Sequence, residues 1–206
     1  MRTTGIIMAG GKSSRMGGNK ALLRIDGKTV IENIAETLEK TVTDIIIVTN
    51  KFEDYQFLGL PMVEDRWKEM GPLAGIHAGL SASSTDKNLV VACDMPFISS
   101  ELGDILLGLL ETFDAAVPNI AGQLHPLFAA YRKDIQEEIN QAIQKQELRI
   151  RQFYKKIHTK IVTEDDLTKL QFDYQDHYLF NMNYPEEFEK ALKLAADHPK
   201  ESRDLS

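Results

Sequence analysis

A glycine-rich loop behind a short apolar run carries residues well suited to chemistry. It spans residues 9–20 and reads AGGKSSRMGGNK. The adjacent Gly10 and Gly11 let backbone N–H groups approach an anion with no Cβ in the way. Arg15 and Lys20 are spaced cations that can surround a triphosphate, and arginine binds phosphate through two parallel hydrogen bonds. We therefore predict that this loop binds the phosphate groups of a nucleotide.

Two common phosphate-binding motifs resemble the loop but do not fit it. A Walker loop, G-x-x-x-x-G-K-[ST], would need glycine at position 6, where the chain has Ile6. The dinucleotide fingerprint G-x-G-x-x-G fails because Gly10 and Gly11 are adjacent and the next glycines are Gly17 and Gly18. An NAD-dependent oxidoreductase is therefore disfavoured. A surface loop whose charges are merely solvated stays open as the alternative.

A second chemical group is the carboxylate of Asp94. It lies at the carboxyl end of the apolar run NLVVACDMPF, which Pro96 helps to end. Ligands of open α/β sheets bind beyond the carboxyl ends of the strands, so a catalytic carboxylate is expected there. An aspartate that caps a turn or a helix is the alternative. We expect the neighbouring Cys93 to be a buried packing residue, because phosphoryl transfer does not require a thiol nucleophile.

Two further polar residues stand near predicted helix starts. Asp65 precedes the glycine-proline pair of residues 71–72. Its carboxylate could accept hydrogen bonds from N1–H and the exocyclic amine of guanine, a paired donor edge that adenine lacks. A solvated loop carboxylate is the alternative. Asn183 stands just before Pro185 and a helix that begins with acidic residues, so a helix cap is one open reading of it.

Apolar runs and helical patterns alternate along the chain, and together they must position these residues. Short apolar runs bounded by turn residues fit strands that are buried on both faces. Alternation with helices predicts βαβ units, and hence a three-layer, Rossmann-like α/β fold with a mainly parallel central sheet. We expect one domain over residues 1–196 and a flexible tail over 197–206. The expected strands lie in residues 5–10, 44–50, 88–96, 114–118 and 126–131, and the clearest helices in 28–40, 71–83, 99–113, 134–145 and 185–198.

Composition excludes several classes of protein. The formal charge of −7 argues against a nucleic-acid partner, although residues 1–25 hold five cations and no acidic residue. The single cysteine, Cys93, excludes an internal disulfide framework and a multi-cysteine zinc site. No charge-free apolar stretch approaches the roughly 20 residues of a membrane span, and no signal peptide is recognisable. We expect a cytoplasmic protein without a membrane partner.

The loop and four later motifs resemble one protein family. MAGGKSSRMGGNK is similar to the L-A-G-G-x-S-x-R-M-G-x-D-K signature of the molybdenum cofactor guanylyltransferase family, a branch of the Rossmann-like nucleotidyltransferases. The likeness continues in family order to about residue 190 through VEDRWKEMGPLAGIHAGL, VVACDMPFI, HPLFAAY and FNMNYPEEF. Two positions depart from the signature: Met8 replaces leucine, and Asn19 replaces the aspartate before Lys20.

The resemblance implies an activity, a metal and roles for the residues. It implies transfer of GMP from GTP to a molybdopterin-type cofactor with release of pyrophosphate, and transient contact with proteins that make or receive that cofactor. It also implies Mg²⁺ as the cofactor, held by Asp94 and completed by Asn183. The implied catalytic residues are Arg15, Lys20 and Asp94, and the implied nucleotide contacts are Met8, Ala9, Gly10, Gly11, Lys20, Asp65 and Asp94.

Two other functions stay open at this point. Within the same chemistry, the protein could be a molybdopterin cytidylyltransferase or another small-molecule nucleotidyltransferase, although GPLAGIHAGL and FNMNYPEEF favour the guanylyl branch. Outside it, a non-catalytic module could bind GTP and a partner protein. That second function leaves the joint presence of Asp94 and Lys20 with the glycine loop unexplained.

Overall fold

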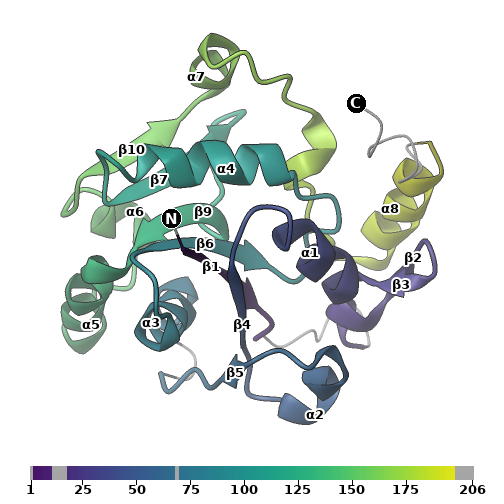
Figure 1. Cartoon of the computed structure of the whole chain (residues 1–206), viewed down its shortest axis with the longest axis horizontal. Helices are drawn as coiled ribbons and strands as arrows, with labels where there is room; N and C mark the ends of the chain where they lie inside the picture. The colour runs from purple at the N-terminus through teal and green to yellow at the C-terminus, as the bar shows by residue number, and fades with distance from the viewer. Residues whose placement is uncertain (1, 11–17, 68–69, 198–206) are drawn as a thin grey trace.

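A mixed β-sheet forms the centre of the protein (Figure 1). The computed structural model describes residues 2–10, 18–67 and 70–197. Within these residues the sheet has eight strands, and a separate hairpin joins β2 (Arg24–Ile25) to β3 (Lys28–Thr29). The strands of the sheet are β1 (Thr3–Met8), β4 (Asp44–Val48), β5 (Met62–Val63), β6 (Lys87–Ala92), β7 (Ala115–Ile120), β8 (Gln123–Leu124), β9 (Phe128–Arg132) and β10 (Thr159–Val162).

The strand order is β10-β7-β9-β6-β1-β4-β5, with β8 paired to the end of β7. β1 runs parallel to both β4 and β6, β4 to β5, and β7 to β10. β9 is the exception in the main path, because it runs antiparallel to β6 and β7. The carboxyl ends of β1, β4, β5, β6 and β7 therefore meet along one edge of the sheet.

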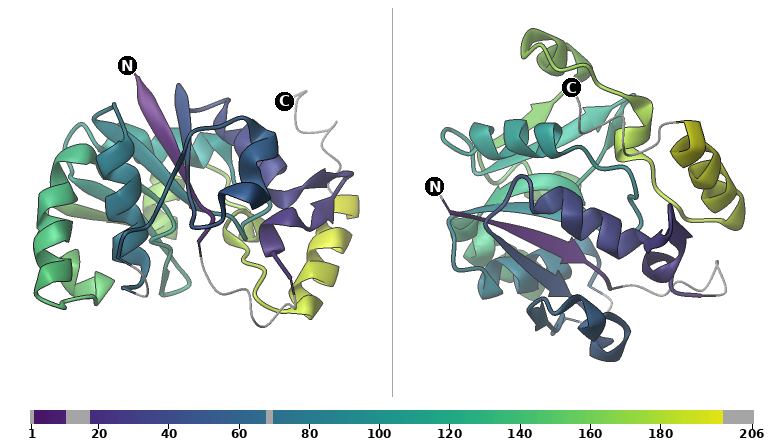
Figure 2. Two further views of the ribbon diagram at one scale, coloured as in Figure 1. Left: turned by 90° about the horizontal axis from the view of Figure 1, so that it is seen from below. Right: turned by 45° about the vertical axis from the view of Figure 1, so that its right-hand side comes forward.

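Helices cover both faces of the sheet (Figures 1 and 2). Because successive strand residues point to opposite faces, Ile6 packs in a core beneath α3 and α5, whereas Ile7 packs in a second core with α1, α4 and α8. No helix in the described residues is long and apolar enough to cross a membrane. The helices are α1 (Val30–Leu38), α2 (Phe52–Tyr55), α3 (Pro72–Ala82), α4 (Ser100–Leu109), α5 (Gln136–Gln144), α6 (Ile150–Phe153), α7 (Glu164–Lys169) and α8 (Pro185–Asp197), with 3₁₀ helices η1 (Lys20–Leu22), η2 (Gln56–Leu58), η3 (Lys133–Ile135) and η4 (Asp176–Leu179).

Local signals in the sequence explain where the main helices begin. α1 starts with a capping box, in which the Thr29 side chain accepts from the N–H of Glu32 and the Glu32 carboxylate accepts from the N–H of Thr29. The side chain of Ser99 caps α4 by accepting a hydrogen bond from the N–H of Leu102. Gly71, whose φ of 72° favours glycine, is the N-cap residue of α3, and Pro72 is the first residue of the helix.

The predicted α/β class and mainly parallel sheet are confirmed. The predicted strand in residues 126–131 exists as β9, but an apolar run carries no sign of its direction, and β9 is reversed. The strand expected in 88–96 ends at Ala92, which leaves Asp94 in the turn just beyond it. The domain limits of 1–196 stay a prediction, and most of the predicted tail, residues 198–206, lies outside the described residues.

Close packing of α3 on the sheet leads to a stability prediction. A Cβ on Gly79 would lie 2.4 Å from Cγ2 of Ile6 and 3.3 Å from Cγ2 of Val48, whereas a Cβ on Gly108 of α4 would meet no atom within 4 Å. For Gly79→Ala, an overpacking cost of about 1–3 kcal/mol exceeds the gain in helix propensity. Gly108→Ala, the matched control, should gain up to about 1 kcal/mol. Urea unfolding measures both, and a stabilised Gly79→Ala would contradict the packing.

Candidate active site at the carboxyl edge of the sheet

β1 and β6 are neighbouring parallel strands, so the segments that follow them begin side by side at the carboxyl edge of the sheet. The N–H of Cys93 donates to the carbonyl of Met8 over 3.1 Å, and the N–H of Ala9 donates to the carbonyl of Val48 over 2.9 Å. These bonds hold the start of the glycine loop between the end of β4 and the turn that carries Asp94. This edge is where open α/β sheets bind ligands.

Lys20 joins three distant parts of the chain at this edge. It opens η1, and its Nζ donates to Oδ1 of Asn183 over 3.0 Å. The same Nζ lies 3.6 Å from Oδ2 of Asp94. Both ionised side chains are largely buried, with exposed fractions of 14% for Lys20 and 21% for Asp94. We refer to Lys20, Asp94 and Asn183 as the Lys20 cluster.

Burial disfavours the negative charge of Asp94, whereas the nearby Lys20 favours it. Burial raises the pKa of Asp94 above its ordinary value, while the Lys20 ammonium group acts in the opposite sense. The Glu187 carboxylate raises that pKa a little further. A carboxylate in this setting attracts a cation strongly, because the surrounding protein screens its charge less than water does.

The segment before α8 places Asn183 in the cluster. The N–H of Met182 donates to the backbone carbonyl of Asp94 over 3.0 Å, which fixes this segment against the turn after β6. The Glu187 carboxylate accepts from the N–H groups of Asn183 and Tyr184 at the start of α8. Glu187 therefore serves the helix start, while the amide oxygen of Asn183 accepts from Lys20.

Glu187 is a contributor that the sequence reasoning missed. The run NYPEEF does contain a signal for it, because a glutamate three residues after Tyr184 has the spacing of a capping box. Asp54 and Tyr55 were also missed. They belong to α2, which lies far from the glycine loop in the sequence, and their contacts with Asn19 have no local signature.

The other predicted loop residues lie partly within the described chain. Met8 ends β1 and its Cε methyl lies over Gly75 of α3, where a Cβ would come within 2.1 Å of it. Ala9 is buried and Gly10 is exposed at the start of the loop. Gly11 and Arg15 lie outside the described residues, so their predicted roles stay predictions.

Asp65 stands apart from the Lys20 cluster. It follows β5, which is separated from β6 by β1 and β4, and neighbouring strands lie about 4.8 Å apart, so Asp65 is roughly 14 Å across the sheet from the end of β6. Its Oδ1 accepts from the N–H of Trp67 over 2.9 Å, and burial raises its pKa above the ordinary value. An extended ligand along the sheet edge could reach both places.

The Lys20 cluster offers oxygen donors to a metal ion. No group of three or more His, Cys, Asp or Glu side chains suited to a metal occurs in the parts of the chain that the structure describes. The cluster instead presents one carboxylate oxygen and one amide oxygen, and the ammonium group of Lys20 lies near both. These two oxygens make the position favourable to cations. Mg²⁺ fits such a set, since it binds through one or two carboxylates and otherwise uses waters and substrate phosphates.

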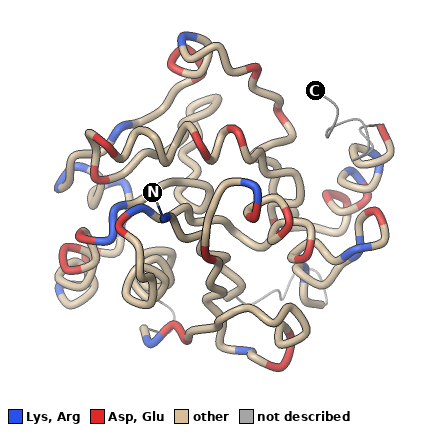
Figure 3. Tube along the Cα trace, in the orientation of Figure 1, with Lys and Arg blue, Asp and Glu red and all other residues tan. Residues whose placement is uncertain are grey.

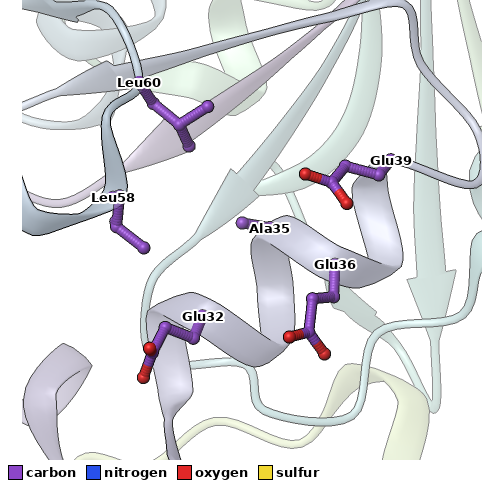
Figure 4. Close-up of a pocket in the computed structure, with 6 residues that line it drawn as sticks. All are labelled: Glu32, Ala35, Glu36, Glu39, Leu58 and Leu60. Atoms are coloured by element: carbon purple, nitrogen blue, oxygen red, sulfur yellow. The ribbon is translucent and has the colours of Figure 1, made fainter.

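A small depression between α1 and residues 58–60 includes no residue of the Lys20 cluster (Figure 4). Its volume of about 120 Å³ is small, and three of its lining side chains are acidic and would repel phosphate. Its lining residues are Glu32, Ala35, Glu36, Glu39, Leu58 and Leu60.

Lys and Arg in the described chain are interspersed with Asp and Glu (Figure 3). The mainly parallel sheet with helices on both faces is the fold of a Rossmann-like nucleotidyltransferase.

Comparison with known proteins assigns the family. Residues 5–161 match the sequence model of the MobA-like NTP transferase domain, and the chain belongs to that family. It is 33% identical to "Molybdenum cofactor guanylyltransferase" of Desulfosudis oleivorans, over 91% of this chain and 93% of the relative. It is 37% identical to "Probable molybdenum cofactor guanylyltransferase" of Pelotomaculum thermopropionicum, over 95% of this chain and 94% of the relative.

A solved structure supports the fold. The chain is similar to the crystal structure of molybdopterin-guanine dinucleotide biosynthesis protein A from Archaeoglobus fulgidus, with a TM-score of 0.78. The match covers 94% of this chain and 99% of the other at 24% sequence identity. At that identity the likeness shows the shared fold alone.

The pairing of Lys20 with Asp94 predicts a pH effect on stability. Lys20→Met removes the ammonium group that opposes burial, so the pKa of Asp94 should rise further. The folded variant then keeps a proton that the unfolded chain releases, and its stability falls as pH rises above the ordinary carboxyl range. We expect its Tm deficit to be about 3 °C larger at pH 8 than at pH 5.5, which corresponds to about 1 kcal/mol.

Thermal unfolding followed by circular dichroism measures this deficit. Lys169→Met, which removes an exposed lysine from α7, is the matched control and should show the same deficit at both pH values. A deficit in Lys20→Met that does not change with pH would show that Lys20 does not compensate the Asp94 charge.

Proposed function

We propose that the protein transfers GMP from GTP to the terminal phosphate of a molybdopterin-type cofactor, releasing pyrophosphate and forming the guanine dinucleotide. The single observation that carries this is the approach of Lys20 to Asp94, because it joins the predicted phosphate loop to the predicted catalytic carboxylate. The relatives named molybdenum cofactor guanylyltransferases support the choice of substrates.

The reaction is a displacement at the α-phosphorus of GTP. A phosphate oxygen of the acceptor forms the new bond to this phosphorus. The bond between the α-phosphorus and the oxygen that bridges it to the β-phosphorus breaks. Pyrophosphate takes the electron pair of the broken bond. Since the attacking oxygen is already anionic at neutral pH, the reaction needs no strong general base, and the protein has to align the groups and neutralise charge.

The Lys20 cluster is suited to that task. Lys20 carries three N–H donors, of which Asn183 takes one, so the group can also bind phosphate oxygens. The low exposure of its side chain strengthens its attraction to the charge that develops on the phosphates. In this proposal the backbone N–H groups of the glycine loop and Arg15 bind the departing pyrophosphate.

Asp94 and Asn183 would hold Mg²⁺ in the working enzyme. When bound there, the ion supplies positive charge to the triphosphate and fixes its orientation. The chain's own contribution is the placement of the two oxygen donors: β6 delivers Asp94, and Glu187 and Met182 hold the segment that carries Asn183.

Asp65 is the proposed reader of the guanine base. Its distance across the sheet from the Lys20 cluster suits a nucleotide whose phosphates lie over β1 and β6 and whose base lies beyond β5. An ionised carboxylate there accepts two hydrogen bonds from guanine, and cytosine and adenine do not offer that pair. We also propose a cytoplasmic location and transient contact with proteins that make or receive the cofactor.

A panel of nucleotides tests the choice of base. Thermal shift with GTP, CTP, ATP and UTP, each with Mg²⁺, should show stabilisation by GTP, because a ligand that binds only the folded state raises Tm by mass action. At a concentration of about one hundred times Kd the expected gain is about 2.7 kcal/mol. A shift with CTP alone would replace this function by cytidylyl transfer.

Removal of the carboxylate tests the chemistry. Asp94→Ala should lower the rate of pyrophosphate release from GTP by at least about a hundredfold, because charge neutralisation at the triphosphate is lost. Its circular dichroism spectrum should stay that of the folded protein. Asp165→Ala, which removes an exposed carboxylate from α7, is the matched control and should keep full activity. Unchanged turnover in Asp94→Ala would remove this residue from catalysis.

A further inference from the structure

Tyr55 connects α2 to Ala9 and Asn19, near the two ends of the glycine loop. Its side chain is buried, with 2% of the residue exposed. Its hydroxyl oxygen accepts from Nδ2 of Asn19 over 2.9 Å. The same hydroxyl lies 3.5 Å from the carbonyl oxygen of Ala9 and 3.2 Å from Oδ1 of Asn19, so its own hydrogen has an acceptor in either direction.

Asn19 uses both ends of its side-chain amide. Nδ2 donates to Oδ2 of Asp54 over 2.9 Å and, with its other hydrogen, to Tyr55. Oδ1 accepts from the N–H of Ala21 over 3.2 Å and so caps η1. Burial raises the pKa of Tyr55 to about 12, so its hydroxyl keeps its hydrogen at neutral pH. The side chain of Asn19 is thus held from three directions.

The position of η1 decides where Lys20 points, because Lys20 is its first residue. We propose that Asp54, Asn19 and Tyr55, here called the Asn19 triad, are positioning residues that fix η1 so that Lys20 reaches Asp94 and the phosphates. The proposal rests on the proposed function, because it assigns Lys20 a role there. None of the three residues of the triad is proposed to touch the reacting atoms.

The triad also accounts for the asparagine at position 19, where the family signature has aspartate. A carboxylate has no hydrogen to donate, so an aspartate here would lose the bond to Asp54 and would place two negative charges within hydrogen-bond distance. The amide donates to Asp54 instead. The pair Asn19 and Asp54 is therefore matched: one partner donates and the other accepts.

An exchange of the two side chains tests this pairing. Asn19→Asp should lower kcat for pyrophosphate release and weaken GTP binding with Mg²⁺, each by at least about tenfold, because Lys20 loses its fixed position. Asp54→Asn keeps an acceptor oxygen and should stay within about threefold of the unchanged protein. The double variant Asn19→Asp/Asp54→Asn restores one donor and one acceptor, and should recover both values to within about threefold.

Removal of the phenolic hydroxyl tests the triad without any change of charge. Tyr55→Phe should also lower kcat and GTP affinity, by about three- to tenfold. Tyr154→Phe is the matched control, because it removes another buried hydroxyl, hydrogen-bonded to Tyr131 over 2.6 Å, at a distance from the Lys20 cluster. It should lower Tm to a comparable extent and leave kcat and the Kd of GTP unchanged.

Two results would overturn the proposal. One is a Tyr55→Phe protein that loses Tm but keeps kcat and Kd, since that is a merely structural role. Another is a double variant as impaired as Asn19→Asp, since that would show that the hydrogen bond between positions 19 and 54 does not position Lys20. If Asn19→Asp does not fold, Tyr55→Phe decides. Lack of pyrophosphate release by the unchanged protein would count against the proposed function, and calorimetric Kd values for GTP would still decide the role of the triad.

Discussion

The buried contact between Lys20 and Asp94 is the interaction on which the rest of the site depends. A carboxylate taken out of water needs a compensating charge, and this one receives it from a residue 74 positions away in the chain. The sheet makes the meeting possible. Because β1 and β6 are adjacent and parallel, the loop that follows one and the turn that follows the other begin at the same edge.

Support for this contact comes from α2 and from the segment at the start of α8. On one side, the hydrogen bonds of Asn19 to α2 hold the start of η1. On the other, the bond from Met182 to the carbonyl of Asp94 and the cap provided by Glu187 hold Asn183. Each support is made of ordinary hydrogen bonds, and the arrangement is specific because they all converge on two oppositely charged groups.

The sequence predicts the layers of the fold and the main polar residues, and it does so for local reasons. Apolar runs between turn residues mark strands, and the end of a run marks where Asp94 must lie. The sequence does not predict the contact of Asn183 with Lys20, because it joins two segments that are 163 positions apart in the chain. The reversal of β9 and the roles of Asp54 and Tyr55 were equally hidden, because pairing direction and contacts between distant segments leave no periodic trace.

Asn183 comes from the part of the chain that follows the matched family domain. The family domain matched here ends at residue 161, yet one polar member of the Lys20 cluster and the glutamate that supports it come from the segment after it. The matched domain thus contributes a cation and an anion, and the segment after it, which packs into the same hydrophobic core through Met182 and Ala191, completes the cluster. Loss of that segment would therefore remove an oxygen donor from Lys20 and part of the core at the same time.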